Sequence, residues 1–321
     1  MNIRTSSTKI PVIVIFAPTA SGKTALTREL FSPRGSHFVL NGEVVSADSQ
    51  QVYRTMDIGT AKPDKDFCKE IPHHLIDILD PEEQFNVSDF VDAADKACED
   101  IYNRGKIPVV CGGTGFYIRN FLYGVPPTPE SDELVRNKLK KRIEIEGNEA
   151  LYNELKSIDP ESALKIHVND SYRICRALEV FYISGKTRTS YQIEHKLRDK
   201  YNFLFIVLEP DREILYRRIR LRVEDMFSNG LAKEINTLKS KGYTKDTPGM
   251  KAIGYSEWFE SDNLEEIREN IKQHSCKYAK KQYTYIRDIK EGITVSYSGT
   301  CEDITNNANI IKQSKISPPT I

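Results

Sequence analysis

Residues 17–24 read A-P-T-A-S-G-K-T, which matches the phosphate-binding loop pattern G-x-x-x-x-G-K-[ST] except that Ala17 replaces the first glycine. In such loops backbone N–H groups surround phosphate oxygens at a helix N-terminus, the lysine adds charge, and the hydroxyl binds Mg²⁺. Alanine costs little where φ is negative, so we expect the loop to bind phosphate; the alternative is a helix that starts with S-G-K-T by chance. The predicted binding residues are Ala17, Pro18, Thr19, Ala20, Ser21, Gly22, Lys23 and Thr24, with Thr24 as the Mg²⁺ ligand.

A carboxylate follows the next apolar run of the chain. Residues 43–48 read E-V-V-S-A-D, so Asp48 and Ser49 stand at the carboxyl end of a predicted strand. Ligands of open α/β sheets bind at such strand ends. Asp48 could act as a general base or hold Mg²⁺ through water, and the residue types leave both roles open.

Three further segments have residues that could contact a ligand. The glycines of C-G-G-T-G (111–115) allow close approach to a ligand, or they form a tight strand-to-helix turn. The arginines of 217–222 could bind phosphate or lie on a solvated helix face. K-K-Q-Y-T-Y-I-R (280–287) interleaves basic and aromatic residues, which suits nucleic-acid binding but also fits an ordinary amphipathic helix.

The elements that must position these residues alternate between strands and helices. Apolar runs at 11–16, 43–48, 107–115 and 202–210 predict buried strands, and residues 87–106 have helical periodicity. This predicts an α/β fold with a parallel sheet. After a proline-rich junction at 125–133, residues 134–198 have helical periods only, which predicts an inserted helical subdomain. The predicted domains are an α/β core at 9–124 and 200–300, an insert at 125–199 and a flexible tail at 301–321.

Composition limits the function classes. The 321 residues contain 46 Lys plus Arg and 46 Asp plus Glu, so any nucleic-acid surface must be local. The 6 cysteines form no C-x-x-C pair, which argues against a zinc knuckle or a disulfide framework and favours a reducing cytoplasm. The apolar run near the start is too short for a signal sequence or a membrane span.

The motifs together resemble one enzyme family. Residues 17–24, D-S-Q-Q-V-Y-R-T-M-D-I-G-T-A-K-P (48–63) and G-G-T-G-F-Y (112–117) are similar to signature blocks of the tRNA dimethylallyltransferases, and further similar blocks follow in family order to about residue 290. The sequence departs from the family pattern at Ala17, at Gln50 and Gln51, at Lys251 where arginine is usual, and at Tyr285 where tryptophan is usual.

The resemblance implies an enzyme with a P-loop NTPase-like parallel sheet and an inserted all-helical subdomain that binds tRNA. Its implied reaction transfers the dimethylallyl group of dimethylallyl diphosphate to N6 of adenosine 37, beside the anticodon, in tRNAs that read codons starting with U. The implied products are N6-isopentenyladenosine and diphosphate. Mg²⁺ is the implied cofactor, tRNA and dimethylallyl diphosphate are the implied partners, and a cytoplasmic monomer with no membrane association is expected.

The resemblance also implies roles for individual residues. The loop would hold the diphosphate leaving group, and Asp48 would take the proton from N6. The implied catalytic residues are Asp48, Thr19, Arg222 and, as a close alternative, Arg218. The implied tRNA contacts are Asp48, Ser49, Gln50, Gln51, Thr114, Arg136, Tyr172, Arg173, Ile174, Cys175, Arg176, Lys251, Ala252, Ile253, Gly254, Tyr255, Ser256, Lys280, Lys281, Gln282, Tyr283, Thr284, Tyr285, Ile286 and Arg287.

Two other functions share part of this pattern. A related enzyme could prenylate free AMP, ADP or ATP with the same core. A P-loop kinase or NTPase would need an arginine-rich lid, which residues 211–222 could imitate. The predicted insertion and residues 280–287 favour the tRNA enzyme, because a free nucleotide requires neither. An adenine in a stacked loop would have to be flipped out to reach the core.

Overall fold

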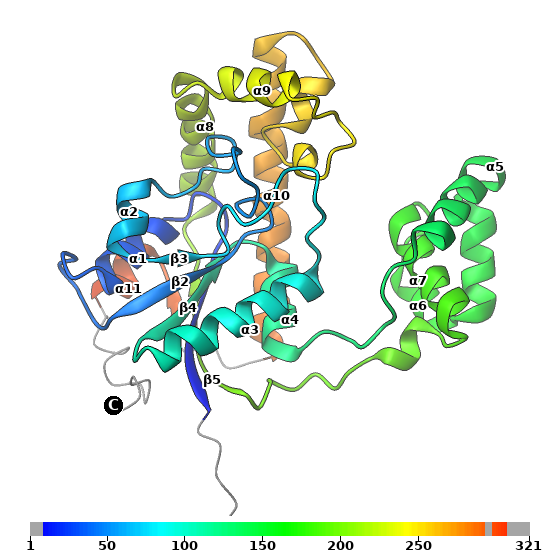
Figure 1. Cartoon of the computed structure of the whole chain (residues 1–321), viewed down its shortest axis with the longest axis horizontal. Helices are drawn as coiled ribbons and strands as arrows, with labels where there is room; N and C mark the ends of the chain where they lie inside the picture. The colour runs from blue at the N-terminus through cyan, green and yellow to red at the C-terminus, as the bar shows by residue number, and fades with distance from the viewer. Residues whose placement is uncertain (1–8, 293–296, 307–321) are drawn as a thin grey trace, which may run out of the picture. The chain divides into compact units, whose positions relative to one another are not determined.

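Six parallel strands form one sheet in the order β3-β2-β4-β1-β5-β6 (Figure 1). The strands are β1 (Ile10–Phe16), β2 (Gly42–Ala47), β3 (His73–His74), β4 (Ile107–Gly112), β5 (Tyr201–Leu208) and β6 (Tyr297–Gly299). The structure is a computed structural model and describes residues 9–292 and 297–306. The predicted α/β class with a parallel sheet is confirmed.

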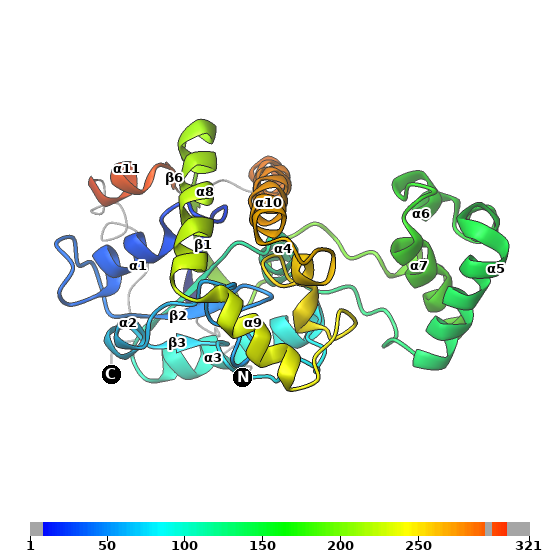
Figure 2. The same ribbon diagram turned by 90° about the horizontal axis from the view of Figure 1, so that it is seen from above.

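Helices cover both faces of this sheet. Alternate residues of a strand point to opposite faces, and both Ile13 and Val14 of β1 are fully buried. Ile13 packs in one cluster with Leu26 and Leu30 of α1, whereas α3 lies along β1, β2 and β4. Figures 1 and 2 show α8 and α10 side by side. The compact unit that contains the sheet comprises the described residues of 1–123 and 197–321. Its described helices are α1 (Lys23–Phe31), α2 (Lys65–Glu70), α3 (Val87–Asn103), α4 (Gly115–Tyr123), α8 (Arg212–Ser228), α9 (Leu231–Ser240), α10 (Leu264–Gly292) and α11 (Cys301–Asn306), with short 3₁₀ turns η2 (Gly249–Lys251) and η3 (Ser256–Phe259).

The strand register brings three loops to one edge of the sheet. Gly112 of β4 is level with Phe16 of β1 and with Ala47 of β2. The next residue of each strand therefore leaves the sheet at the same height. The phosphate loop, the Asp48 segment and the turn at 113–115 consequently start side by side.

Residues 124–196 form a second compact unit. All of them are described, and their regular elements are α5 (Glu133–Ile158), α6 (Pro160–Lys165), α7 (Ser171–Ser184) and η1 (Arg188–Tyr191). The φ of 82° at Gly147 interrupts the helical path of α5. Leu139, Leu151 and Leu178 belong to the core of this unit.

The prediction of a flexible tail from residue 301 is wrong for residues 301–306. They form α11, which packs against α1, and Ile304 is 2% exposed in the core cluster of the sheet. The Thr300 N–H donates to Asp303 Oδ2 at 2.8 Å, and the Asp303 N–H donates to Thr300 Oγ1 at 3.2 Å, so the helix start is capped. The polar composition of the segment concealed its apolar contacts, which are Ile304 and the partly buried Cys301. The rest of the predicted tail, 307–321, lies outside the described residues.

The described helices were compared with the length and hydrophobicity of membrane-spanning helices. None of them combines the length and the apolar character that crossing a membrane requires.

Candidate active site

The phosphate loop joins β1 to α1 and accommodates Ala17 without strain. Positive φ angles in this loop occur at Ala20 (59°) and Gly22 (100°) among the described residues, and therefore not at Ala17. Ala17 is fully buried, and its N–H donates to the Gly112 carbonyl at 3.2 Å. An L-residue fits there because the left-handed conformations that favour glycine fall later in the loop.

Lys23 projects into the loop that it follows. Its Nζ donates to the carbonyls of Ala17 at 3.1 Å and Pro18 at 2.8 Å. Burial lowers the pKa of Lys23 to about 8; Arg222 adds to this effect, whereas Cys111 and Asp48 oppose it. Lys23 is therefore within electrostatic reach of both the Asp48 carboxylate and the Arg222 guanidinium.

Arg222, from the middle of α8, contacts the phosphate loop directly. Its Nη1 donates to Thr19 Oγ1 at 3.0 Å. Burial lowers the pKa of Arg222, and the charge of Asp48 opposes that shift. Arg218, the predicted alternative, is exposed and lies near Cys301 of α11. Of the two arginines, Arg222 is the one that bonds to the loop.

Asp48 begins a tight turn at the end of β2. Its Oδ1 accepts from the N–H of Gln50 at 2.9 Å and of Gln51 at 3.4 Å. The Ser49 N–H donates to Thr114 Oγ1 at 3.0 Å. The Asp48 turn is thus attached to the turn after β4, and the carboxylate is held at the strand end.

The glycines of the turn after β4 permit the close approach of α10. A Cβ on Gly113 would lie 2.4 Å from Gln282 Nε2, and one on Gly115 would lie 2.5 Å from Tyr285 Cβ. Real side chains do not pack at such distances. Close packing against α10, which neither alternative of the sequence analysis considered, therefore accounts for both glycines.

One face of α10 lines the site and includes a residue that the sequence analysis missed. Tyr278, Gln282 and Tyr285 follow helical i, i+4, i+7 spacing. The Tyr278 hydroxyl lies near the side chains of Thr114 and Gln282, and burial, followed by the charge of Asp48, raises its pKa to about 12. Extending the helical stripe of 280–287 by one turn would have found Tyr278.

The predicted tRNA contacts in 280–287 divide between two environments. Gln282 and Ile286 are buried, and Tyr283 donates its hydroxyl to the Pro210 carbonyl at 2.8 Å. The exposed residues of this segment are Lys280, Lys281, Thr284 and Arg287.

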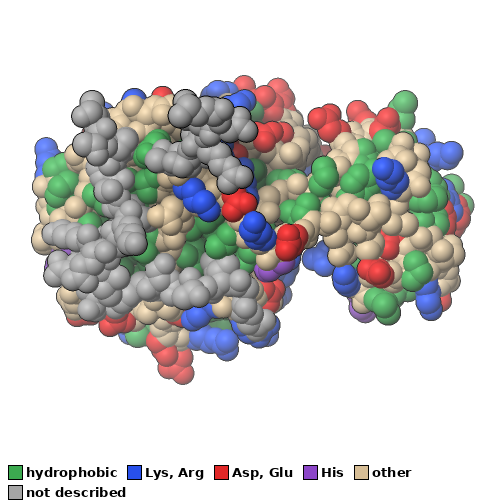
Figure 3. All heavy atoms as spheres, turned by 90° about the horizontal axis from the view of Figure 1, so that it is seen from below, with side chains coloured by type: hydrophobic (Ala, Val, Ile, Leu, Met, Phe, Trp, Pro, Cys, Tyr) green, Lys and Arg blue, Asp and Glu red, His purple; other side chains and the backbone are tan. Residues whose placement is uncertain are grey.

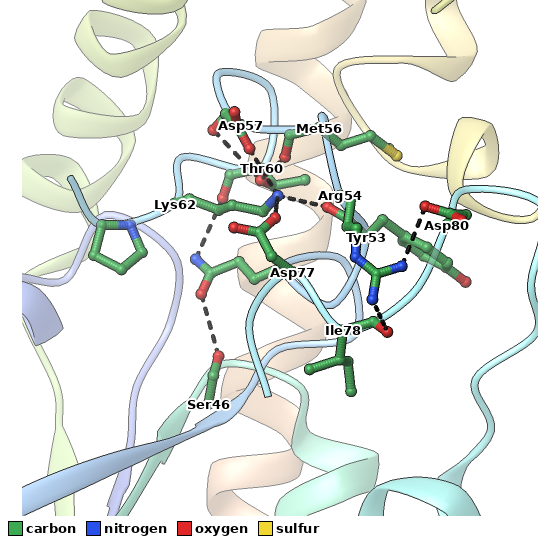
Figure 4. Close-up of polar contacts among 12 residues, drawn as sticks. Ser46, Tyr53, Arg54, Met56, Asp57, Thr60, Lys62, Asp77, Ile78 and Asp80 are labelled. Carbon is green, nitrogen blue, oxygen red and sulfur yellow. Dashed lines mark hydrogen bonds and ion pairs between the residues drawn. The ribbon is translucent and has the colours of Figure 1, made fainter. Parts of the chain in front are cut away.

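The segment after Asp48 is held by a buried lysine (Figure 4). The Lys62 side chain is 5% exposed, and its Nζ pairs with Asp57 Oδ1 at 2.8 Å and with Asp77 Oδ1 at 2.5 Å. It also donates to the Tyr53 carbonyl. Figure 4 shows these bonds converging on one ammonium group. The motif residues of this segment therefore stabilise the fold around Asp48.

Glu234 of α9 accepts hydrogen bonds from the backbone of residues 57–59 in the same segment. Its Oε2 accepts from the N–H of Asp57 at 2.9 Å and of Ile58 at 2.8 Å, and its Oε1 accepts from that of Gly59 at 3.2 Å. The Tyr255 hydroxyl also donates to Oε1, at 2.6 Å. Four donors thus share one carboxylate.

Glu234→Ala is expected to lower the free energy of unfolding by about 3 kcal/mol, because these donors lose a charged acceptor. Trp258, the only tryptophan of the chain, lies in the same cluster as Tyr255. Its fluorescence during urea unfolding measures the effect. Asp92→Ala, on the exposed side of α3, is the control, and equal midpoints for the two variants would contradict the prediction.

The predicted tRNA-contacting segment 251–256 also contains both buried and exposed residues. Tyr255 is fully buried and Ala252 is 5% exposed, so neither presents its side chain to a ligand. Gly254 is buried as well, with a φ of 97°. Lys251 is exposed, and Ile253 and Ser256 are partly exposed.

The predicted contacts of the second unit include two arginines with internal partners. Arg176 Nη1 and Arg136 Nη2 bond to Glu179 Oε2 at 2.8 and 3.5 Å. Glu179 is 1% exposed. Burial would raise the pKa of Glu179, but Ser131, Arg176 and Arg136 outweigh burial and lower it. Arg136 and Arg176 therefore stabilise a buried charge.

The other predicted residues of this unit divide by exposure. Ile174 and Cys175 are in its core, whereas Tyr172 is 72% exposed and Arg173 is exposed. The face of the unit visible in Figure 3 has basic side chains scattered among hydrophobic and acidic ones. Side chains of Tyr172 and Arg173 are thus available to a partner, and those of Ile174 and Cys175 are not.

Thr24 and Asp48 are the side chains considered above as ligands for Mg²⁺. Within 9–292 and 297–306, no group of three or more His, Cys, Asp or Glu side chains is placed to bind one. Thr24 is exposed at the start of α1, and Asp48 is partly exposed. Mg²⁺ commonly takes one or two protein oxygens together with substrate phosphates and waters, so this donor set fits Mg²⁺ with a phosphorylated substrate.

Comparison with known proteins identifies the relatives of this chain. A family model described as IPP transferase matches residues 51–289. The chain is 39% identical over 308 residues to a tRNA dimethylallyltransferase of Geobacter sulfurreducens, covering 94% of this chain and 97% of the relative. It is 44% identical over 292 residues to a tRNA dimethylallyltransferase of an Exiguobacterium species, covering 89% and 90%.

Solved structures give the same result. A tRNA isopentenylpyrophosphate transferase from Bacillus halodurans is similar with a TM-score of 0.64 and 34% identity, covering 95% of this chain and 98% of that one. A eukaryotic dimethylallyltransferase described as acting on tRNA is similar with a TM-score of 0.77 and 31% identity, covering 94% and 77%.

Proposed function

The chain belongs to the IPP transferase family and transfers a dimethylallyl group to tRNA, and from that premise we propose that its acceptor is N6 of adenosine 37, beside the anticodon. The proposed donor is dimethylallyl diphosphate, and the proposed acceptor tRNAs read codons that start with U. One observation carries the proposal: the strand register starts the phosphate loop and the Asp48 turn at the same edge of the sheet, and Arg222 Nη1 donates to Thr19 Oγ1 of that loop at 3.0 Å. A leaving diphosphate and a proton acceptor can thus share one site.

The reaction breaks the bond between the allyl carbon and the diphosphate oxygen and forms a bond from that carbon to N6. The electron pair leaves with the diphosphate, whose growing charge is stabilised by Lys23, by Arg222 with Thr19, and by the loop N–H groups. The N6 lone pair is delocalised and weakly nucleophilic. We assign Asp48 as the base that accepts the N6 proton while the new bond forms.

Mg²⁺ is the proposed cofactor. Thr24 would hold it against the diphosphate, where it would neutralise part of the charge of the leaving group. The protein is proposed to act as a monomer in the cytoplasm.

The test offers labelled dimethylallyl diphosphate with tRNA, with AMP or with ATP as acceptor. Label in tRNA, mapped to the adenosine beside the anticodon, is the expected outcome. Label in AMP or ATP would favour the free-nucleotide enzyme. Hydrolysis of ATP in step with turnover would favour a kinase or NTPase and contradict the proposal.

We further propose that exposed basic residues of α5 bind tRNA phosphates. Lys138, Lys140 and Lys141 are exposed on this helix. Changing all three to alanine is expected to weaken tRNA binding and to reduce its salt dependence, because each phosphate contact contributes about 0.7 to 0.9 to the slope of log K against log salt. Equilibrium binding at several salt concentrations measures the slope.

The matched control changes Lys65, Lys69 and Lys96, three exposed lysines of α2 and α3, to alanine. Arg136 is left unchanged because its loss would leave the Glu179 charge with one partner fewer. If both triple variants keep the wild-type slope, the lysines of α5 are a solvated helix face and the proposed placement of tRNA is wrong. The KM for dimethylallyl diphosphate is expected to remain unchanged in both.

A further inference from the structure

Gln282 of α10 is a buried polar side chain that joins two loops of the site. It is 2% exposed. Its Oε1 accepts from the Thr19 N–H at 2.9 Å, and its Nε2 donates to the Gly113 carbonyl at 2.7 Å. Thr19 is in the phosphate loop, and Gly113 is in the turn after β4. One amide group therefore satisfies a donor and an acceptor from different loops.

Each of these loops leads to a group with a proposed role in the reaction. On one side, Thr19 Oγ1 accepts from Arg222 at 3.0 Å. On the other side, Thr114 follows Gly113 and accepts from the Ser49 N–H at 3.0 Å, next to Asp48. Gln282 thus stands between the groups assigned to the diphosphate and those assigned to the adenine.

The surroundings leave Gln282 little freedom. A Cβ on Gly113 would lie 2.4 Å from Gln282 Nε2, so the amide occupies the space that this glycine leaves. The Tyr278 hydroxyl lies near the same side chain. The register of β1 with β4 fixes where the two loops begin, and Gln282 fixes how their continuations lie relative to each other.

We propose that Gln282 is a positioning residue for dimethylallyl transfer, which aligns the phosphate loop with the turn after β4 so that the allyl carbon and the adenine nitrogen meet. The proposal rests on the proposed function. It replaces the tRNA contact that the resemblance implied for this residue with a role inside the protein. A misplacement of reacting groups by about 1 Å costs about 10²-fold in rate.

Two variants test the alignment. Gln282→Met removes both bonds at similar volume, and Gln282→Glu keeps an acceptor for Thr19 but places a second oxygen against the Gly113 carbonyl. The single-turnover rate at saturating tRNA and dimethylallyl diphosphate is expected to fall about 10²-fold in Gln282→Met. The dissociation constant of each substrate alone is expected to stay within about threefold. Gln273→Met and Gln273→Glu, on the exposed side of α10, are matched controls that keep the wild-type rate.

The outcomes separate this proposal from the function on which it rests. A wild-type protein that modifies no tRNA contradicts the proposed function. An active wild type with a Gln282→Met rate within threefold of it contradicts the positioning role, as does a loss that appears only as weaker tRNA binding. If Gln282→Met does not fold, Gln282→Glu is judged by the same two measurements.

Discussion

Asp48→Asn is expected to lower the rate of dimethylallyl transfer about 10²- to 10⁴-fold, which is the usual contribution of a general base. Asparagine keeps the Oδ1 that accepts from the N–H groups of Gln50 and Gln51 at 2.9 and 3.4 Å. The turn is therefore expected to persist, and tRNA affinity is expected to stay within a few-fold of wild type. Single-turnover transfer of labelled dimethylallyl to tRNA and equilibrium tRNA binding measure the two quantities.

The Mg²⁺ concentration distinguishes the two roles considered for Asp48. If the carboxylate acts only by holding Mg²⁺ through water, raising Mg²⁺ is expected to restore the activity of Asp48→Asn. A lost base is not replaced at any Mg²⁺ concentration. Asp66→Asn, at a side chain that is 92% exposed on α2, is the control. Activity of Asp48→Asn above a tenth of wild type would contradict the assignment of the base.

The sequence predicted the strands that form long apolar runs and missed the short ones. β1 is buried from Pro11 to Phe16 and β5 from Leu204 to Leu208, which is typical of parallel strands covered on both faces. β3 has only two residues, His73 and His74. They are a strand because Val44 and Val45 lie beside them, and this pairing leaves no pattern in the local sequence.

The local sequence likewise revealed some residues of the site and not others. Asp48 directly follows β2, and Lys23 follows the phosphate loop after β1. Predicting the strands is therefore enough to predict that the two residues lie at the same edge of the sheet. Glu234 could not be found in this way. Its hydrogen bonds reach residues 175 to 177 positions earlier in the chain, and its spacing on α9 resembles that of any half-exposed helix residue.

Motif blocks also concealed the division of each helix into faces. The resemblance assigned all of 280–287 to tRNA, but the helical period buries Gln282 and Ile286 while Lys280 and Arg287 are exposed. One motif block thus contains both exposed residues that a ligand could contact and buried residues that pack inside the protein. The helical period of the sequence is sufficient to separate the two.

Lys23→Met is expected to lower kcat about 10²- to 10³-fold and to raise the KM for dimethylallyl diphosphate. Negative charge grows on the diphosphate as the carbon–oxygen bond breaks, so the ammonium stabilises the transition state more than the bound substrate. Steady-state kinetics at saturating tRNA, with dimethylallyl diphosphate varied, give both constants. Lys65→Met, exposed on α2, is the control, and a kcat within threefold of wild type in Lys23→Met would contradict the diphosphate role of the loop.

The pH dependence separates the charge of Lys23 from its bulk. Burial lowers the pKa of Lys23 from 10.5 to about 8, so the substrate-free protein loses this positive charge as the pH rises through about 8. The ratio kcat/KM reports ionisations of the free enzyme, and for dimethylallyl diphosphate it is expected to fall about tenfold per pH unit above that point. In Lys23→Arg the guanidinium stays charged, so the alkaline fall is expected to disappear although the activity is lower. The same fall in Lys23→Arg would assign it to another group, and the charge of Lys23 would then not be what holds the diphosphate.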